Sequence, residues 1–254
     1  MSSQKFSPVS PDFMAKVQAR KPWLFEFEYG GVSFGGIRQR DFDKVALFHK
    51  VMKRIGAQPR HILELGSHEG SHSFQLAELP GVQAVLGLEA RHENVDRAEF
   101  VKAVYGANNV QFQVVDLEKS DITQLGDFET IFCAGLLHHL SRPWRMLKAM
   151  GSVARYIYLD THYCVECPHE RDGFRGRVVR QDVENPQDGV VEEAFWLSFQ
   201  DLVMLLADSG FVIHHIVDNK HNRNGPRIRI VAENMGASCE WSRRPPSPAA
   251  AAAG

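Results

Sequence analysis

The sequence predicts an α/β fold with a mostly parallel sheet, and two observations carry that prediction. Between residues 61 and about 160, apolar runs of strand length alternate with amphipathic segments of helix length, which is typical of strand–helix–strand units. Nearer the C-terminus, residues 211–217 and 227–232 are two strand-like runs separated by an Asn/Gly-rich turn. We therefore expect a parallel sheet that is completed by an antiparallel hairpin.

The composition is that of an ordinary globular protein. The 254 residues are 44% hydrophobic and 24% charged, which suits one α/β domain with elaborations. No apolar run approaches the ~20 residues of a membrane span, and we expect no membrane partner. We see no signal-peptide core, and four cysteines in a chain of this length are no disulfide framework. A cytoplasmic location is therefore expected. The composition does not predict the oligomeric state.

The chain divides into three predicted parts, and the second of them contains an insertion. Residues 1–40 form an N-terminal arm, loosely held up to residue 22, and a β-hairpin that turns at Gly30–Gly31. Residues 41–235 form the main domain, which starts with a helix over 41–55. Residues 164–195 are an irregular insertion, rich in charge, Gly and Pro, that we expect to be a lid or acceptor pocket. Residues 236–254 form a disordered tail.

Residues 62–71 hold the most informative motif. A strand ends at Gly66 and a helix begins near Ser71, so glycines allow the tight loop between them to approach a ligand closely. Glu64 distinguishes this loop from a dinucleotide site, because a pyrophosphate prefers backbone N–H groups without a carboxylate beside them. A carboxylate there suits a ligand with a cationic amine, such as S-adenosylmethionine (SAM).

This segment resembles motif I of the class I SAM-dependent methyltransferases, an acidic residue followed by Gly-x-Gly-x-Gly. The chain keeps three of these positions and has His68 at the middle glycine. The resemblance extends over about residues 41–234. It implies a Rossmann-like fold with a seven-stranded sheet of order 3-2-1-4-5-7-6, and S-adenosyl-L-methionine as cofactor. It also implies a group of cofactor-binding residues, Glu64, Gly66, Ser67, His68 and Gly70.

Two later strands end in carboxylates, as the resemblance requires. Glu89 lies 23 residues after Gly66, and Ala90 is next to it. Nucleotide-binding folds place the carboxylate that binds the ribose at about this distance from the glycine turn. The alternative for Glu89 is a surface ion pair. Asp116 and Leu117 follow the next strand, at the position that meets the adenine in the family. The alternative for Asp116 is a turn or N-cap aspartate.

A fourth strand, residues 128–134, leads into a loop that the resemblance places over the cofactor. We expect Ala134 at the cofactor, and His138 and His139 in the loop. A hydroxyl acceptor needs a base, and histidine suits that role at neutral pH. His162 follows the fifth strand at the same sheet edge. We predict His139 as the base, with His162 and His138 as further candidates. The alternative for the His138–His139 pair is that at least one of them has a packing role. The alternative for His162 is a loop residue without a functional role.

A cluster of possible metal ligands follows the fifth strand. His162, Cys164, Cys167 and His169 have local zinc-like spacing, but a closed zinc site normally adds a distant second pair. We therefore predict no metal. Cys133 lies in a predicted buried strand and is expected in the core.

The second half of the chain also resembles the tRNA uridine carboxymethyltransferases, which use carboxy-SAM. The likeness lies in residues 135–143, in Trp196-x-Ser198-Phe199 and in residues 209–211. That group has tyrosine where this chain has His138, which favours SAM over carboxy-SAM. We predict methylation of a small-molecule or glycan-like acceptor, at oxygen.

Three alternatives remain open. Residues 1–60 carry eleven Lys/Arg and five Asp/Glu, so an RNA-modifying enzyme is one of them. A non-catalytic SAM-binding protein is the second. A nicotinamide-dependent enzyme is the third, but Glu64 and the terminal hairpin oppose it.

Overall fold

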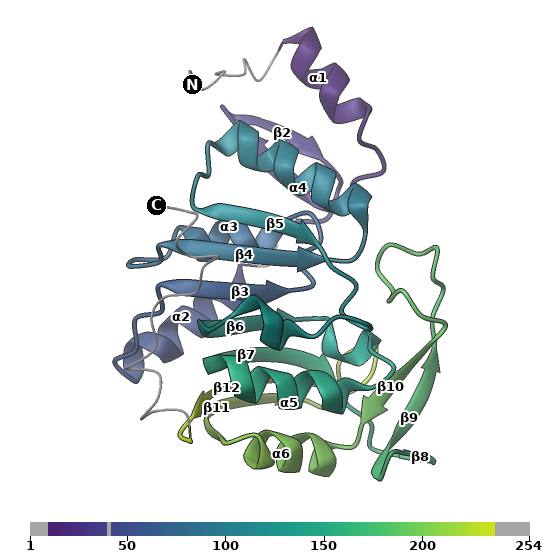
Figure 1. The fold of residues 1–254 in the computed structure, drawn as a ribbon. Coiled ribbons are helices and arrows are strands. Elements are labelled where there is room, and N and C mark those ends of the chain that lie inside the picture. Colours follow the sequence, from purple (N-terminus) through teal and green to yellow (C-terminus); the bar gives the residue numbers. More distant parts are fainter. Residues whose placement is uncertain (1–9, 40–41, 237–254) are drawn as a thin grey trace.

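A computed structural model of the chain describes residues 10–39 and 42–236, and its largest element is a seven-stranded sheet (Figure 1). The strands are β3 (His61–Leu65), β4 (Ala84–Glu89), β5 (Val110–Val114), β6 (Phe128–Ala134), β7 (Ala154–His162), β11 (Phe211–Asn219) and β12 (Arg227–Asn234). Their spatial order is β5-β4-β3-β6-β7-β12-β11, and β12 runs antiparallel to both of its neighbours. Counted along this sheet the order is 3-2-1-4-5-7-6, so the predicted fold is confirmed.

The helices cover both faces of this sheet. They are α2 (Asp43–Arg54), α3 (Ser71–Ala77), α4 (His92–Tyr105), α5 (Pro143–Val153) and α6 (Phe199–Asp208), with short 3₁₀ turns η1 (Ile122–Leu125) and η2 (Leu137–His139). Local sequence sets their ends. The hydroxyl of Ser198 accepts a hydrogen bond from the backbone N–H of Asp201 and caps α6. Gly106 ends α4 in the left-handed conformation. No helix in the described ranges is long and apolar enough to cross a membrane.

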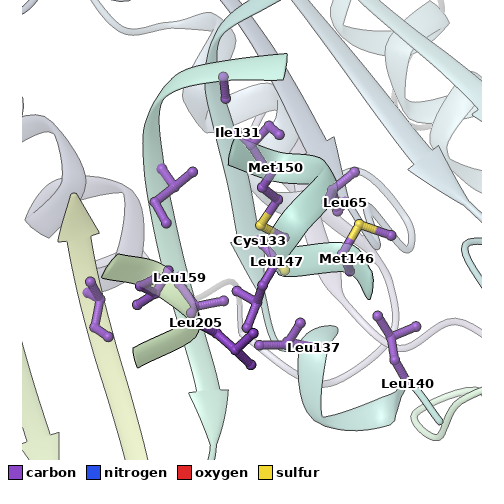
Figure 2. Close-up of a cluster of buried hydrophobic side chains, with 14 of the residues drawn as sticks. Leu65, Ile131, Cys133, Leu137, Leu140, Met146, Leu147, Met150, Leu159 and Leu205 are labelled. Carbon is purple, nitrogen blue, oxygen red and sulfur yellow. The ribbon is translucent and has the colours of Figure 1, made fainter. Parts of the chain in front are cut away.

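Alternation along the strands divides the apolar side chains into two cores, one on each face. Ile131 and Cys133 of β6 face the core under α5 and α6, while Phe132 between them faces the other. Figure 2 shows the first core, where leucine side chains from β3 and β7 meet Met146 and Met150 of α5. Cys133 is fully buried there, as predicted. In the second core the rings of Phe132 and Tyr158 stack at 4.5 Å.

The N-terminal segment is more ordered than predicted. Residues 11–18 form helix α1 (Pro11–Gln18), whose start is capped by Ser10. Phe13 is fully buried against the antiparallel hairpin β1 (Glu26–Tyr29) and β2 (Val32–Gly35), and against Phe100 of α4. Apolar packing at long sequence separation orders this segment, which local composition does not reveal. The rest of the predicted arm, residues 1–9, and all of the predicted tail after Gly236 lie outside the described residues.

The predicted irregular insertion contains a second sheet. Strands β8 (His169–Arg171), β9 (Phe174–Arg180) and β10 (Glu193–Leu197) pair antiparallel in the order β10-β9-β8. The connection between β9 and β10, called here the 181–192 loop, has no regular structure. The small sheet lies beyond the carboxyl ends of the parallel strands (Figure 1), so it faces the edge where the predicted site residues gather.

Candidate active site

A cavity of about 520 Å³ lies at the carboxyl ends of the parallel strands. Three parts of the chain surround it. The main sheet supplies the strand ends, the N-terminal segment supplies Leu24, Phe25 and Arg38, and the 181–192 loop covers the remaining side. Open α/β sheets bind their ligands at this edge. The structure places seven of the predicted cofactor residues in the wall, namely Gly66, Ser67, His68, Glu89, Ala90, Leu117 and Ala134.

Glu89 is placed to accept hydrogen bonds from a ligand. Its carboxylate is buried in the cavity wall and accepts hydrogen bonds from the backbone N–H groups of His68 (3.0 Å) and Arg91 (2.9 Å). Burial raises the pKa of Glu89, and these two bonds oppose that effect. Because a carboxylate has about four acceptor positions, it keeps capacity for two ribose hydroxyls.

Three predicted cofactor residues do not line the cavity. Glu64 is buried behind the wall, where it accepts a hydrogen bond from Ser73 and lies 3.4 Å from Nδ1 of His72. His72 itself lines the cavity, so it stands between Glu64 and the ligand space. Gly70 begins α3 at φ 80°, and a Cβ there would lie 2.7 Å from the ring of Phe112. This glycine is therefore required by packing.

Asp116 is the third of these residues, and it is a turn aspartate. Its carboxylate accepts the backbone N–H of Glu118 at 3.0 Å and pairs with Lys119 at 2.8 Å. These local partners hold the side chain in its own turn, while Leu117 and Glu118 reach the cavity.

His68 replaces the middle glycine of the motif and contributes a neutral ring. The residue has a positive φ of 51°, and its ring packs edge-on against Phe25 at 5.5 Å. Burial lowers its pKa to about 4. Neither ring nitrogen has a partner in hydrogen-bond geometry, although the Pro186 backbone lies near enough to oppose part of the burial effect. His68 therefore adds an uncharged polar surface to the cavity.

The three candidate histidines lie together. The ring of His138 is 4.3 Å from that of His139 and 4.6 Å from that of His162, and all three line the cavity. The hydrogen bonds of His139 and His162 assign these two rings a tautomer, because a carbonyl oxygen only accepts and an N–H group only donates.

His139 keeps a free lone pair in this assignment. Its Nδ1 lies 2.6 Å from Oε1 of Gln181, which is an acceptor, so Nδ1 carries the proton and Nε2 does not. Burial lowers the pKa of His139, and the bond to Gln181 opposes this. The ring is therefore neutral at pH 7, with an available Nε2.

His162 is not placed to act as a base. Its Nδ1 donates to the carbonyls of Gly225 and Pro226, both at 3.1 Å. Its Nε2 accepts from Nη1 of Arg227 at 3.0 Å, so no lone pair remains for a substrate. The sequence could not show this, because the partners come from the turn before β12.

His138 is a buried, neutral ring. Its Nδ1 contacts both the backbone N–H of His162, at 3.4 Å, and the hydroxyl group of Thr161, at 3.3 Å, and this hydroxyl can donate or accept. Burial, together with the charges of its neighbours, lowers the pKa of His138 well below the usual value.

Other charged groups also lie at the site. Asp160 is fully buried and pairs with Arg227 at 2.6 Å and with Lys44 at 3.4 Å. Burial opposes ionisation of Asp160, but the cations outweigh it and lower its pKa. The sequence did not identify Arg91 and Gln181 as site residues, because their partners are distant in the chain: loop carbonyls for Arg91, and His139 with loop backbone groups for Gln181.

The suspected zinc ligands do not form a site in this structure. Cys164 and Cys167 are joined in a disulfide, so neither offers a thiolate. His169 accepts the backbone N–H of Val178 within the small sheet. Within residues 10–39 and 42–236, no group of three His, Cys, Asp or Glu side chains is arranged to hold a metal ion.

Comparison with known proteins agrees with this geometry. A family model described as a methyltransferase domain matches residues 59–190. The N-terminal domain of EvdMO1, crystallised in the presence of S-adenosylhomocysteine (SAH) and D-fucose, is 32% identical, with a TM-score of 0.78. The match covers 92% of this chain and 99% of that domain. The chain belongs to the class I SAM-dependent methyltransferases. This methyltransferase spans 49% of the longer chain in a further crystal structure of EvdMO1.

Partial relatives are found among curated proteins. The tRNA U34 carboxymethyltransferase of Desulforapulum autotrophicum is 32% identical over 89 residues, which are 35% of this methyltransferase and 27% of that protein. The protein of the same name from Campylobacter curvus is 21% identical over 119 residues, which are 46% of this chain and 39% of that one. The methyltransferase therefore matches well under half the length of these relatives.

The cofactor is SAM, and the residues of the cavity fit it. An acceptor carboxylate, Glu89, stands beside a glycine turn in which the backbone N–H groups of Gly66 and Ser67 both donate to the carbonyl of Leu88, at 2.9 Å. A side chain at Gly66 would meet Leu136 and has to adopt a φ of 75°. Glycine is thus required at this turn by its backbone conformation and by the contact with Leu136.

Proposed function

We propose that this methyltransferase transfers the methyl group of SAM to a hydroxyl group of a sugar or sugar-like small molecule, with His139 as general base. One observation carries the proposal. The Nδ1–H of His139 is taken by Gln181, which leaves the Nε2 lone pair of a neutral histidine in the cofactor cavity.

The chemistry requires a base of this kind. Bound SAM supplies an electrophilic sulfonium methyl group. A sugar hydroxyl is a weak nucleophile while it holds its proton, and Nε2 of His139 can accept that proton during transfer. The resulting imidazolium keeps its Nδ1–H bond to Gln181, and the carboxylate of Asp188 also favours the charged ring. General-base catalysis of this type contributes about 10²–10⁴-fold.

The remaining cavity wall suits a polyhydroxylated acceptor. Trp196 offers an aromatic surface beside the histidines, and its ring stacks on that of His162 at 4.7 Å. The amide of Asn224 and the charged groups of Lys44 and Arg227 line the same space. Sugar sites combine a flat apolar surface with convergent hydrogen-bonding groups. The D-fucose named with the EvdMO1 domain supports the same acceptor class.

Modification of tRNA is the competing function. The two carboxymethyltransferase relatives favour it, although each match covers less than half of this chain. An RNA substrate predicts binding that weakens steeply with salt, because phosphate contacts release counterions. A non-catalytic SAM-binding role predicts cofactor binding and no methylated product.

One experiment separates these outcomes. Purified enzyme and SAM are incubated with D-fucose, with a panel of monosaccharides and glycosides, and with total tRNA, and the products are analysed by mass spectrometry. We expect a sugar that gains one O-methyl group, and much less product from the His139→Ala variant. Methylated tRNA, or methylation at nitrogen, would contradict the proposal. SAH binding with no product from any of these acceptors would favour the non-catalytic role.

A further inference from the structure

We propose that Gln181 is a positioning residue, and that it holds His139 in its active tautomer only while the 181–192 loop is closed over the cavity. This inference rests on the proposed role of His139. It extends that role to a link between loop closure and the base.

The side-chain amide of Gln181 makes four hydrogen bonds. Its Oε1 accepts from Nδ1 of His139 (2.6 Å) and from the backbone N–H of Gly189 (2.8 Å). Its Nε2 donates to the carbonyls of His139 and Val191, both at 3.0 Å. The side-chain amide therefore uses both ends, and its partners belong to η2 and to the 181–192 loop.

The backbone partners determine which way the amide points. Gly189 offers an N–H, so it requires the oxygen, while the two carbonyls require the nitrogen. With that orientation fixed, the oxygen faces His139 and keeps the proton on Nδ1. Two of the three backbone groups, those of Gly189 and Val191, lie at the far end of the loop, of which Gln181 is the first residue. When the loop opens, the amide loses these groups and is free to present its nitrogen to His139. The proton would then move to Nε2, and the lone pair needed for catalysis would be lost.

The middle of the same loop is held by Arg91, which also lines the cavity. Nη2 of Arg91 lies within hydrogen-bond distance of four loop carbonyls, at 3.0–3.4 Å, those of Val183, Asn185, Asp188 and Gly189. The backbone N–H of Arg91 donates to Glu89, the predicted ribose ligand, at 2.9 Å. The loop thus connects a residue at the cofactor to the residue that orients the base.

Close packing leaves the loop little freedom in this position. A Cβ at Gly189 would lie 2.7 Å from Nε2 of Gln181 and 2.8 Å from the carbonyl oxygen of His139. The backbone of the loop therefore touches both partners directly. A bound cofactor that stabilises Arg91 and the loop would also stabilise the active tautomer, so the base would be formed mainly in the loaded enzyme.

Nitrogen-15 NMR of histidine-labelled protein with saturating SAH tests this directly, because the two tautomers give different ring-nitrogen shifts. The His139 signals are assigned by their loss in His139→Asn. In the wild type we expect the proton on Nδ1. Gln181→Met should move a measurable fraction of it to Nε2. Arg91→Ala should do the same, although Arg91 does not contact His139. Gln181→Glu should raise the pKa of His139 by about one or more, because a nearby carboxylate favours the imidazolium.

The matched control is Gln200→Glu, which makes the same charge change at an exposed residue of α6 that contacts Arg175. It should leave both the tautomer and the pKa of His139 unchanged. If Gln181→Met keeps the wild-type tautomer, the positioning role is wrong. If only Arg91→Ala keeps it, the link to the loop is wrong. Either result leaves the proposed function intact as long as His139→Ala loses turnover. Normal turnover of His139→Ala refutes the base itself, whatever the NMR shows.

Discussion

The carboxylate of Glu69 accepts a hydrogen bond of 2.8 Å from the backbone N–H of Phe25. Glu69 lies in the glycine turn of the cofactor motif, and Phe25 lies in the segment that precedes β1. A second bond, from the N–H of Leu24 at 2.9 Å, uses the other carboxylate oxygen. The motif thus holds the N-terminal segment at the cavity, where Leu24 and Phe25 form part of the wall.

Removal of this carboxylate should destabilise the fold. Glu69→Ala leaves two backbone donors without their partner, and we expect a loss of about 2–4 kcal/mol in the free energy of unfolding. Weaker SAH binding should accompany it, because Phe25 borders the cofactor space. Urea denaturation and calorimetry measure the two effects. Glu78→Ala, at an exposed residue of the next helix end, is the control and should change neither.

Glu89 should dominate cofactor affinity. Glu89→Ala is expected to weaken SAM and SAH binding by about 1.5–3 kcal/mol, the range for hydrogen bonds to a charged group. Isothermal calorimetry provides the measurement, with the exposed Glu93→Ala as control. NAD should not bind the wild-type enzyme. Equal SAH affinity of the Glu89 variant and the wild type, or binding of NAD, would contradict the assigned ribose contact.

His139 should govern the pH profile. Its pKa is lowered by burial, and a base works in its neutral form, so kcat/KM should stay high below pH 6.5 and fall only at more acidic pH. His139→Ala should lose about 10²–10⁴-fold in turnover and still bind SAH. His162→Ala should lose less, because both of its nitrogens are already occupied. An acidic limb at or above pH 6.5, or full activity of His139→Ala, would argue against this role.

The 181–192 loop should be the point of ligand-sensitive proteolysis. The strands on either side of it are paired, so a protease of broad specificity should cut within the loop and spare β9 and β10. SAH should slow the cleavage, because it favours the closed loop. Arg91→Ala should speed it, because the loop loses its contacts with the guanidinium group. Cleavage that neither SAH nor the variant alters would mean that the loop does not respond to the cofactor.

The sequence by itself determined the order of strands and helices, the strand ends at which site residues gather, and the SAM motif. These features depend on local periodicity and on glycine turns, which neighbouring residues encode. Gly66, Glu89 and His139 were predicted in this way as site residues, and all three line the cavity. Ser198 was likewise identified as a helix cap from its own neighbourhood.

Only the tertiary structure decided which of these groups are available to a ligand. Asp116 and His162 occupy predicted positions, yet both use their hydrogen-bonding atoms within the protein. The carboxylate of Asp116 accepts a hydrogen bond in its own turn. The ring nitrogens of His162 bond Arg227 and two distant carbonyls. The amide of Gln181 orients His139 across 42 residues of chain. Hydrogen-bond partners at such separations are set by packing, because a polar side chain can bond to many different groups and the sequence does not say which of them will lie near it. The fold selects one of them, and with it the tautomer and charge of each group.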